Sequence, residues 1–150
     1  MNLGTIGEVA GQGAIPDTYV AIPWAYHMKK PILLIEDDRP YRQALRLYLE
    51  SHGFTAKEAE DGREALLLLD GGLDVDIIIS DYHMPVINGL DFLKALSYRV
   101  KGQEVRVILV SGNMTKEIEK EAKQAGAFAL LAKPIDFHEL LALVSRAGKP

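Results

Sequence analysis

Side chains that can bind a metal ion or handle a phosphoryl group follow four separate apolar segments of the sequence. They are three consecutive acids, a further aspartate, a serine and a lysine: Glu36, Asp37, Asp38, Asp81, Ser111 and Lys133. If the apolar segments are parallel strands, their carboxyl ends lie at one edge of a sheet, which is where open α/β sheets bind ligands. The six side chains would then meet in a single site.

The chemistry of such a site follows from its charges. Carboxylates held close together repel one another and raise at least one pKa unless a cation joins them. A hard divalent ion with oxygen ligands suits the site, and Mg²⁺ is the natural candidate. With the ion bound, Asp81 can stay ionised as a nucleophile, while the ion and Lys133 neutralise the oxygens of an incoming phosphoryl group. Ser111 can donate a hydrogen bond to a phosphoryl oxygen, so a charge change at Asp81 would move the loop that begins at Ser111.

From residue 31 onward, short apolar runs alternate with helical periodicity, which is typical of a parallel sheet covered by helices on both faces. The pattern predicts five strands, over 32–35, 54–58, 75–80, 105–110 and 128–132. It also predicts five helices, over 41–49, 65–69, 90–96, 115–125 and from 136 onward. The first run is continuous rather than alternating, as a strand buried on both faces requires. The fold class is therefore α/β.

Residues 1–28 differ from the rest of the chain, because four glycines and two prolines interrupt any helical pattern there. We expect an irregular extension over 1–28 and one domain over 29–150. The dipeptide His27-Met28 also resembles a cloning junction, which leaves open whether residues 1–27 are native.

The composition fits one soluble globular domain, with 48% hydrophobic and 25% charged residues among 150. The absence of cysteine excludes a disulfide framework, a thiolate metal site and a cysteine nucleophile, and it fits a reducing compartment. The net charge of -4 provides no basic stripe, so we expect no direct nucleic-acid binding. No apolar run is long enough for a membrane span, and the first residues do not resemble a secretory signal, so we expect a cytoplasmic protein.

Four segments give the chain a specific resemblance to the receiver domains of response regulators, which act in two-component signalling, across residues 30–147. The segments read ILLIEDDRPYR from Ile32, DIIISDYHMPVING from Asp76, VILVSGN from Val107 and LLAKPID from Leu130. The resemblance implies a flavodoxin-like, doubly wound, five-stranded parallel sheet in the order 2-1-3-4-5, with helices on both faces.

The resemblance also implies roles for the acidic residues. Asp81 takes the position of the phosphoacceptor, and it forms the magnesium pocket with Glu36 and Asp37. Asp38 takes a variable third position. The backbone carbonyl of His83 takes the position of a further magnesium ligand, whereas the His83 side chain is expected to be a partly exposed bystander.

At the other two strand ends, Ser111 takes the position of the family's switch hydroxyl and Lys133 that of its lysine. The bond from Lys133 to Pro134 is cis in relatives, which proline tolerates. One position departs from the family pattern: relatives usually carry tyrosine or phenylalanine where this chain has Leu130. Phe128 is expected to point the same way as Leu130 because strand side chains repeat every two residues.

The expected function is transfer of a phosphoryl group from a histidine kinase or histidine phosphotransfer protein to Asp81, followed by a changed affinity for an unknown downstream protein. No turnover of an external substrate is expected, so the chain would not be an enzyme. It would be a stand-alone receiver or a fragment of a longer regulator or hybrid kinase. We expect partners to dock on the first helix, around Arg39, Arg42 and Arg46, and on the face of the fourth and fifth helices.

Two other classes of protein fit less well. An aspartyl-nucleophile hydrolase of the haloacid-dehalogenase type needs a second acid two residues after the nucleophile, where this chain has His83. A flavin carrier needs a Ser/Thr/Gly phosphate-binding loop after the first strand, where this chain has acids that would repel a phosphate.

Overall fold

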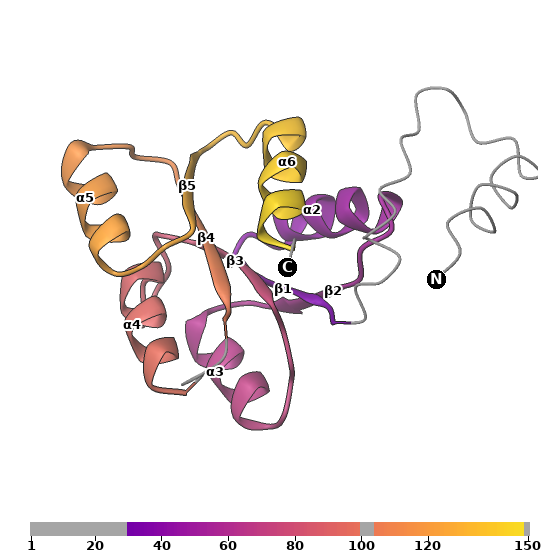
Figure 1. Cartoon of the computed structure of the whole chain (residues 1–150), viewed down its shortest axis with the longest axis horizontal. Coiled ribbons are helices and arrows are strands. Elements are labelled where there is room, and N and C mark those ends of the chain that lie inside the picture. Colours follow the sequence, from indigo (N-terminus) through magenta and orange to yellow (C-terminus); the bar gives the residue numbers. More distant parts are fainter. Residues whose placement is uncertain (1–29, 100–103, 149–150) are drawn as a thin grey trace, which may run out of the picture.

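A computed structural model describes residues 30–99 and 104–148 of the chain (Figure 1). The expected extension over 1–28 lies outside these residues. Strands and helices alternate along the described chain, which confirms the α/β class. In order they are β1 (Ile32–Ile35), α2 (Arg39–Ser51), β2 (Ala56–Ala59), α3 (Gly62–Asp70), β3 (Ile77–Asp81), α4 (Gly89–Arg99), β4 (Arg106–Ser111), α5 (Lys116–Gln124), β5 (Ala129–Ala132) and α6 (Phe137–Ala147).

The five strands form one sheet in the order β2-β1-β3-β4-β5, and every neighbouring pair is parallel. The predicted topology is therefore confirmed. The register aligns the carboxyl ends of the central strands, because Ile35 of β1 pairs with Ser80 of β3 and Asp81 pairs with Val110 of β4. Residues that follow these strand ends are consequently brought to one edge of the sheet.

Apolar side chains on the two faces of the sheet form two separate cores. Leu33 and Ile35 of β1 face a cluster that includes residues of α3, α4 and α5, whereas Ile32 and Leu34 face residues of α2 and α6. Figure 1 shows the same division, with α2 and α6 on one side of the sheet and the other three helices opposite. Both faces of the central strands are thus buried, which explains why their sequences are continuously apolar.

Capping side chains fix where most helices begin. Asp38, Asp61, Thr115 and Asp136 each accept a hydrogen bond from a backbone N–H in the first turn of the helix that follows. These bonds satisfy donors that have no partner within the helix. Asp38, the third acid after β1, therefore has a structural role as the cap of α2.

The second strand begins two residues later than the sequence predicts, at Ala56, because Phe54 caps the end of α2. Gly53 has a φ of 90°, and the Phe54 N–H donates to the Leu49 carbonyl at 3.1 Å. A left-handed residue followed by a backbone hydrogen bond that reaches back five residues is the Schellman motif, which ends a helix. The third strand likewise begins at Ile77 rather than at residue 75.

None of the helices in the described part of the chain has the length and apolar character that crossing a membrane requires.

The loop between β3 and α4 packs against the carboxyl end of β3 at a position that only glycine fits. The Gly89 N–H donates to the Tyr82 carbonyl at 2.8 Å. A Cβ atom at Gly89 would lie 2.5 Å from the Asp81 carbonyl oxygen and 2.9 Å from the Tyr82 Cα. Both neighbours are backbone atoms, so neither can rotate away.

We predict that Gly89→Ala lowers the free energy of unfolding by about 1–3 kcal/mol, since an extra methyl group in a closely packed region forces the backbone to shift. Urea unfolding of the Gly89→Ala and Gly112→Ala proteins measures the effect. Gly112 is the matched control because a Cβ there would meet no atom within 4 Å. Equal stability of the two variants would show that the loop moves aside at no cost.

Candidate functional site

Three carboxylates meet at the carboxyl edge of the sheet. Glu36 and Asp37 follow β1, and Asp81 is the last residue of the neighbouring strand β3. One carboxylate oxygen from each lies within 4.8 Å of the others. Glu36 is 3% exposed and Asp81 8% exposed, whereas Asp37 is exposed. We expected these three acids to cluster from their positions in the sequence, and the structure brings them together.

Lys133, which follows β5, provides a positive charge to two of the three acids. Its Nζ lies 2.7 Å from Glu36 Oε1 and 3.3 Å from Asp81 Oδ2. The ammonium group also lies 4.9 Å from the centre of the Tyr41 ring. Burial opposes the charge of Lys133, but the hydrogen bond to Glu36 and the charge of Asp81 together hold the pKa of this lysine above its usual 10.5. The peptide bond to Pro134 is cis, as the resemblance implies.

The single ammonium group does not balance the acids. Burial raises the pKa of Glu36 to about 7, although the hydrogen bond from Lys133 lowers it, and the nearby Asp81 raises it further. Glu36 Oε2 is buried and has no hydrogen-bond partner among the described residues. A buried carboxylate oxygen without a donor is costly, and a divalent cation would remove that cost. The donor set of carboxylate oxygens fits a hard ion.

Arg42 on α2 fixes the backbone where the acids leave β1. Its guanidinium donates to the Glu36 carbonyl at 2.6 Å and to Glu58 Oε1 at 2.7 Å. Arg42 is buried, so its expected place on a docking surface is wrong. The sequence does indicate that Arg42 is buried, because Arg42, Leu45 and Leu49 lie at the i, i+3 and i+7 positions that face the core. Arg39 is exposed and remains available to a partner.

Ser111 at the end of β4 is fully buried, and its hydroxyl already has neighbours. Ser111 Oγ donates to the Asn113 carbonyl at 2.9 Å and accepts from the Asn113 N–H at 3.1 Å. It also lies 3.2 Å from Nε2 of His83. The His83 side chain is exposed, as expected, but it contacts the candidate switch hydroxyl, which sequence reasoning missed because the two residues are distant in the chain. The role of the His83 carbonyl stays a prediction.

The expected direction of Phe128 is wrong. Leu130 packs in the core on the side of α3, α4 and α5, whereas Phe128 packs in the core on the side of α2 and α6. The two-residue repeat fails because Phe128 precedes β5, which begins at Ala129. The guanidinium of Arg106 lies 5.1 Å from the centre of the Phe128 ring.

Comparison with known proteins agrees with this geometry. Residues 32–145 match the sequence profile of the response regulator receiver domain. The transcriptional regulatory protein FixJ of Azorhizobium caulinodans is 34% identical over 76% of this chain and 53% of its own length. The transcriptional regulatory protein CpxR of Escherichia coli is 35% identical over 75% of this chain and 47% of its own length. The chain thus spans about half the length of these curated relatives.

Solved structures give the same result. The chemotaxis protein CheY4 of Vibrio cholerae superposes with a TM-score of 0.73 at 30% identity, covering 79% of this chain and 98% of that one. A response regulator receiver protein of Pseudomonas putida superposes with a TM-score of 0.72 at 31% identity, covering 78% of this chain and 97% of that one. The sequence profile, the relatives and the fold agree with the acidic edge and its lysine: the chain belongs to the response regulator receiver domains of two-component signalling.

Proposed function

We propose that Asp81 accepts a phosphoryl group from a phosphohistidine donor. An Asp81 carboxylate oxygen attacks phosphorus, the bond from phosphorus to the donor's imidazole nitrogen breaks, and an acyl phosphate forms on Asp81. The observation that carries the proposal is the position of Lys133, whose Nζ lies 3.3 Å from Asp81 Oδ2 and 2.7 Å from Glu36 Oε1. A fixed ammonium group at this place stabilises the extra negative charge on the phosphoryl oxygens.

Glu36, Asp37, Asp81 and the backbone carbonyl of His83 would hold Mg²⁺. When bound, the ion supplies charge neutralisation for the phosphoryl oxygens. The three clustered carboxylates and the unpartnered Glu36 oxygen support this assignment. The Ser111 hydroxyl would then donate a hydrogen bond to a phosphoryl oxygen and so make the loop after β4 respond to phosphorylation.

The chain would act as a signalling domain that is phosphorylated and dephosphorylated without turning over an external substrate. The hydrolase alternative is not favoured, because His83 occupies the place of the second acid that such an enzyme needs. The phosphodonor would be a histidine kinase or a histidine phosphotransfer protein, with the exposed Arg39 as part of its docking surface on α2.

The output of the whole protein is a separate question. The curated relatives above are named transcriptional regulators, and this chain spans about half of each. The expectation that the chain does not itself contact nucleic acid therefore stays a prediction, as do its downstream partner and its location in the cytoplasm.

The Asp81 assignment predicts a single labelled residue. Acetyl phosphate with Mg²⁺ should add one phosphoryl group to the unaltered protein, in a bond that hydroxylamine cleaves, and Asp81→Asn should abolish the addition. Intact-mass spectrometry measures both. Asp76→Asn is the matched control, because Asp76 lies just before β3, at its opposite end, and should leave labelling unchanged. Labelling that persists in Asp81→Asn would discard the assignment.

Lys133→Ala should still bind Mg²⁺ but should bind beryllofluoride, an analogue of the phosphoryl group, about tenfold or more weakly. A hydrogen bond to a charged group contributes about 1.5–3 kcal/mol, and about 1.4 kcal/mol corresponds to tenfold in affinity. Calorimetric titration with each ligand measures the effect. A Lys133→Ala protein that binds beryllofluoride as tightly as the unaltered protein would show that Lys133 does not contact the phosphoryl group.

The raised pKa of Glu36 predicts how stability depends on pH in the absence of Mg²⁺. Its value of about 7 in the folded protein exceeds its ordinary value of 4.5. The stability that protonated Glu36 contributes is therefore complete below pH 4.5 and is lost as the pH rises through 7. Bound Mg²⁺ should restore it at high pH, because the ion stabilises the ionised carboxylate.

Urea unfolding with and without Mg²⁺, at pH values on both sides of 7, tests this expectation. Glu36→Gln should flatten the pH dependence and weaken the stabilisation by Mg²⁺, since glutamine cannot ionise. Glu50→Gln on the exposed side of α2 is the control and should behave as the unaltered protein does. Equal pH dependence in Glu36→Gln and Glu50→Gln would contradict the role of Glu36.

A further inference from the structure

Tyr82, the residue after Asp81, connects the end of β3 to a distant helix. Its hydroxyl donates to Glu121 Oε2 on α5 at 2.9 Å, and its side chain is buried. Its backbone is fixed at the same time, because the Tyr82 N–H donates to the Val110 carbonyl at 2.7 Å and its carbonyl accepts from Gly89 at 2.8 Å. The side chain therefore reaches α5 from a backbone that is held directly beside the candidate phosphoacceptor.

A continuous series of contacts joins Ser111 to the same helix. Nε2 of His83 lies 3.2 Å from Ser111 Oγ. The rings of Tyr82 and His83 meet edge to face, with their centres 4.9 Å apart and their planes at 62°. The series then ends at the hydrogen bond from Tyr82 to Glu121. We refer to Ser111, His83, Tyr82 and Glu121 as the relay.

We propose that Tyr82 and His83 are positioning residues that transmit phosphorylation of Asp81 to α5, a proposal that rests on the function proposed above. The Ser111 hydroxyl carries one proton, which it donates to the Asn113 carbonyl. When a phosphoryl oxygen accepts the hydrogen bond from this hydroxyl instead, the hydroxyl must leave its present arrangement, and the contact with His83 changes with it. The His83 ring then shifts against the Tyr82 ring and loosens the bond from Tyr82 to Glu121.

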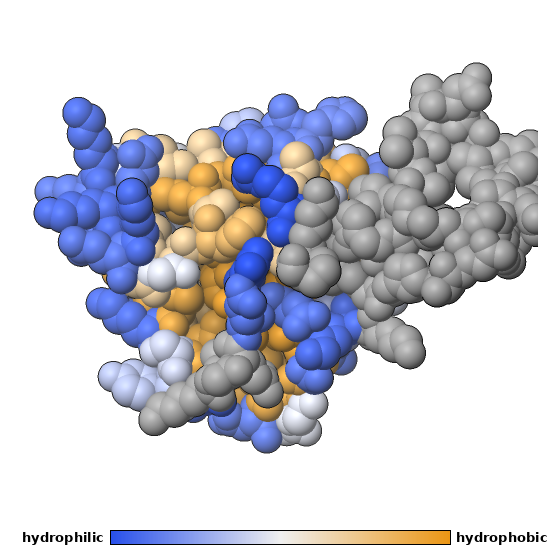
Figure 2. All heavy atoms as spheres, viewed as in Figure 1, coloured by the Kyte–Doolittle hydropathy of each residue, from blue (hydrophilic) through white to orange (hydrophobic). Residues whose placement is uncertain are grey.

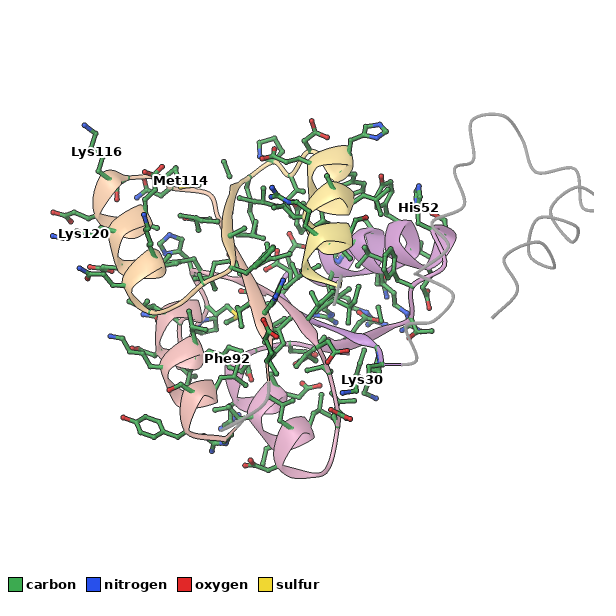
Figure 3. The ribbon with its side chains drawn as sticks, viewed as in Figure 1. Lys30, His52, Phe92, Met114, Lys116 and Lys120 are labelled. Atoms are coloured by element: carbon green, nitrogen blue, oxygen red, sulfur yellow. The ribbon has the colours of Figure 1, made fainter. Side chains whose placement is uncertain are left out.

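Helix α5 is the element that such a change would affect most. Ala122 is its one buried residue, and its partly buried Ile118 packs at the edge of the core. Figure 3 shows Lys116 and Lys120 directed away from the domain, and Figure 2 shows hydrophilic residues gathered over this helix. Because apolar burial holds α5 weakly, one hydrogen bond to a buried tyrosine is a large part of its attachment.

The relay also ends at a surface hollow. Glu121 lines a hollow of about 270 Å³ between α4 and α5, together with Leu90, Lys94, Gln124 and Ala125. Release of Glu121 from Tyr82 would change both the shape and the charge of this hollow. Phosphorylation of Asp81 would thus change the surface that α4 and α5 present to a binding partner.

Hydrogen exchange of the α5 amides, measured with and without Mg²⁺ and beryllofluoride, tests the relay. In the unaltered protein, saturation with beryllofluoride should speed exchange of these amides about fivefold, as expected for loss of one hydrogen bond that holds the helix. Tyr82→Phe removes only the hydroxyl that bonds Glu121. Its α5 amides should exchange fast without beryllofluoride and respond little when it is added.

Three further variants serve as controls. Glu121→Gln keeps an acceptor oxygen and should retain the response, whereas Glu121→Ala should behave as Tyr82→Phe does. Tyr98→Phe changes an exposed tyrosine on α4 and should have no effect. Because coupling is reciprocal, Tyr82→Phe and Glu121→Ala should bind beryllofluoride about fivefold more tightly than the unaltered protein, since binding no longer costs them this hydrogen bond. Glu121→Gln and Tyr98→Phe should bind it with unaltered affinity.

The outcomes separate the relay from the function on which it rests. If the unaltered protein binds no beryllofluoride, both proposals are overturned. If it binds and Tyr82→Phe shows the full beryllofluoride response, the hydroxyl of Tyr82 only stabilises α5 and the relay is overturned. Unchanged or slower exchange of the α5 amides in the saturated, unaltered protein would overturn the relay as well.

Discussion

The acidic edge of the sheet in this receiver domain carries more negative charge than Lys133 can neutralise. Two buried carboxylates, Glu36 and Asp81, share the single ammonium group of Lys133, and the carboxylate of Asp37 lies beside them. Lys133 cannot satisfy all of these oxygens, and one Glu36 oxygen has no partner among the described residues. Such a site favours a bound cation, because the cation neutralises the excess carboxylate charge. With the cation bound, the site also favours a negatively charged phosphoryl group on Asp81. The parallel strands hold these charged groups together, because their carboxyl ends lie at one edge of the sheet.

Close contacts surround the acidic site on several sides. Arg42 holds the Glu36 backbone from one side of the sheet, and Gly89 lets the next loop pack directly on Asp81. The Ser111 hydroxyl is occupied as well. Closely packed groups with few free hydrogen-bonding positions cannot absorb a phosphoryl group without rearranging. In the proposed relay, the contacts of His83 and Tyr82 would direct that rearrangement towards α5.

The sequence predicted the sheet order and the convergence of the acids, because continuous apolar runs identify buried parallel strands and the resemblance supplied the strand order. It did not predict Arg42 as a buried residue, because an arginine is usually exposed and only its place on the apolar stripe indicated otherwise. To predict the direction of the Phe128 side chain, one must know where β5 begins. Strand propensity does not locate that boundary to within one residue. The contact of His83 with Ser111 could not be predicted, because it depends on the path of two loops that no local pattern describes.

A crystal structure with Mg²⁺ and beryllofluoride would show whether the crowded carboxylates hold a dication and prepare Asp81 for phosphorylation. We predict one ion about 2.1 Å from carboxylate oxygens of the Glu36, Asp37 and Asp81 cluster, the usual distance for Mg²⁺. We also predict beryllium bonded to an Asp81 oxygen, with Lys133 and Ser111 in contact with the fluorides. An ion bound elsewhere, or beryllofluoride on a residue other than Asp81, would rule out this site as the phosphorylation site.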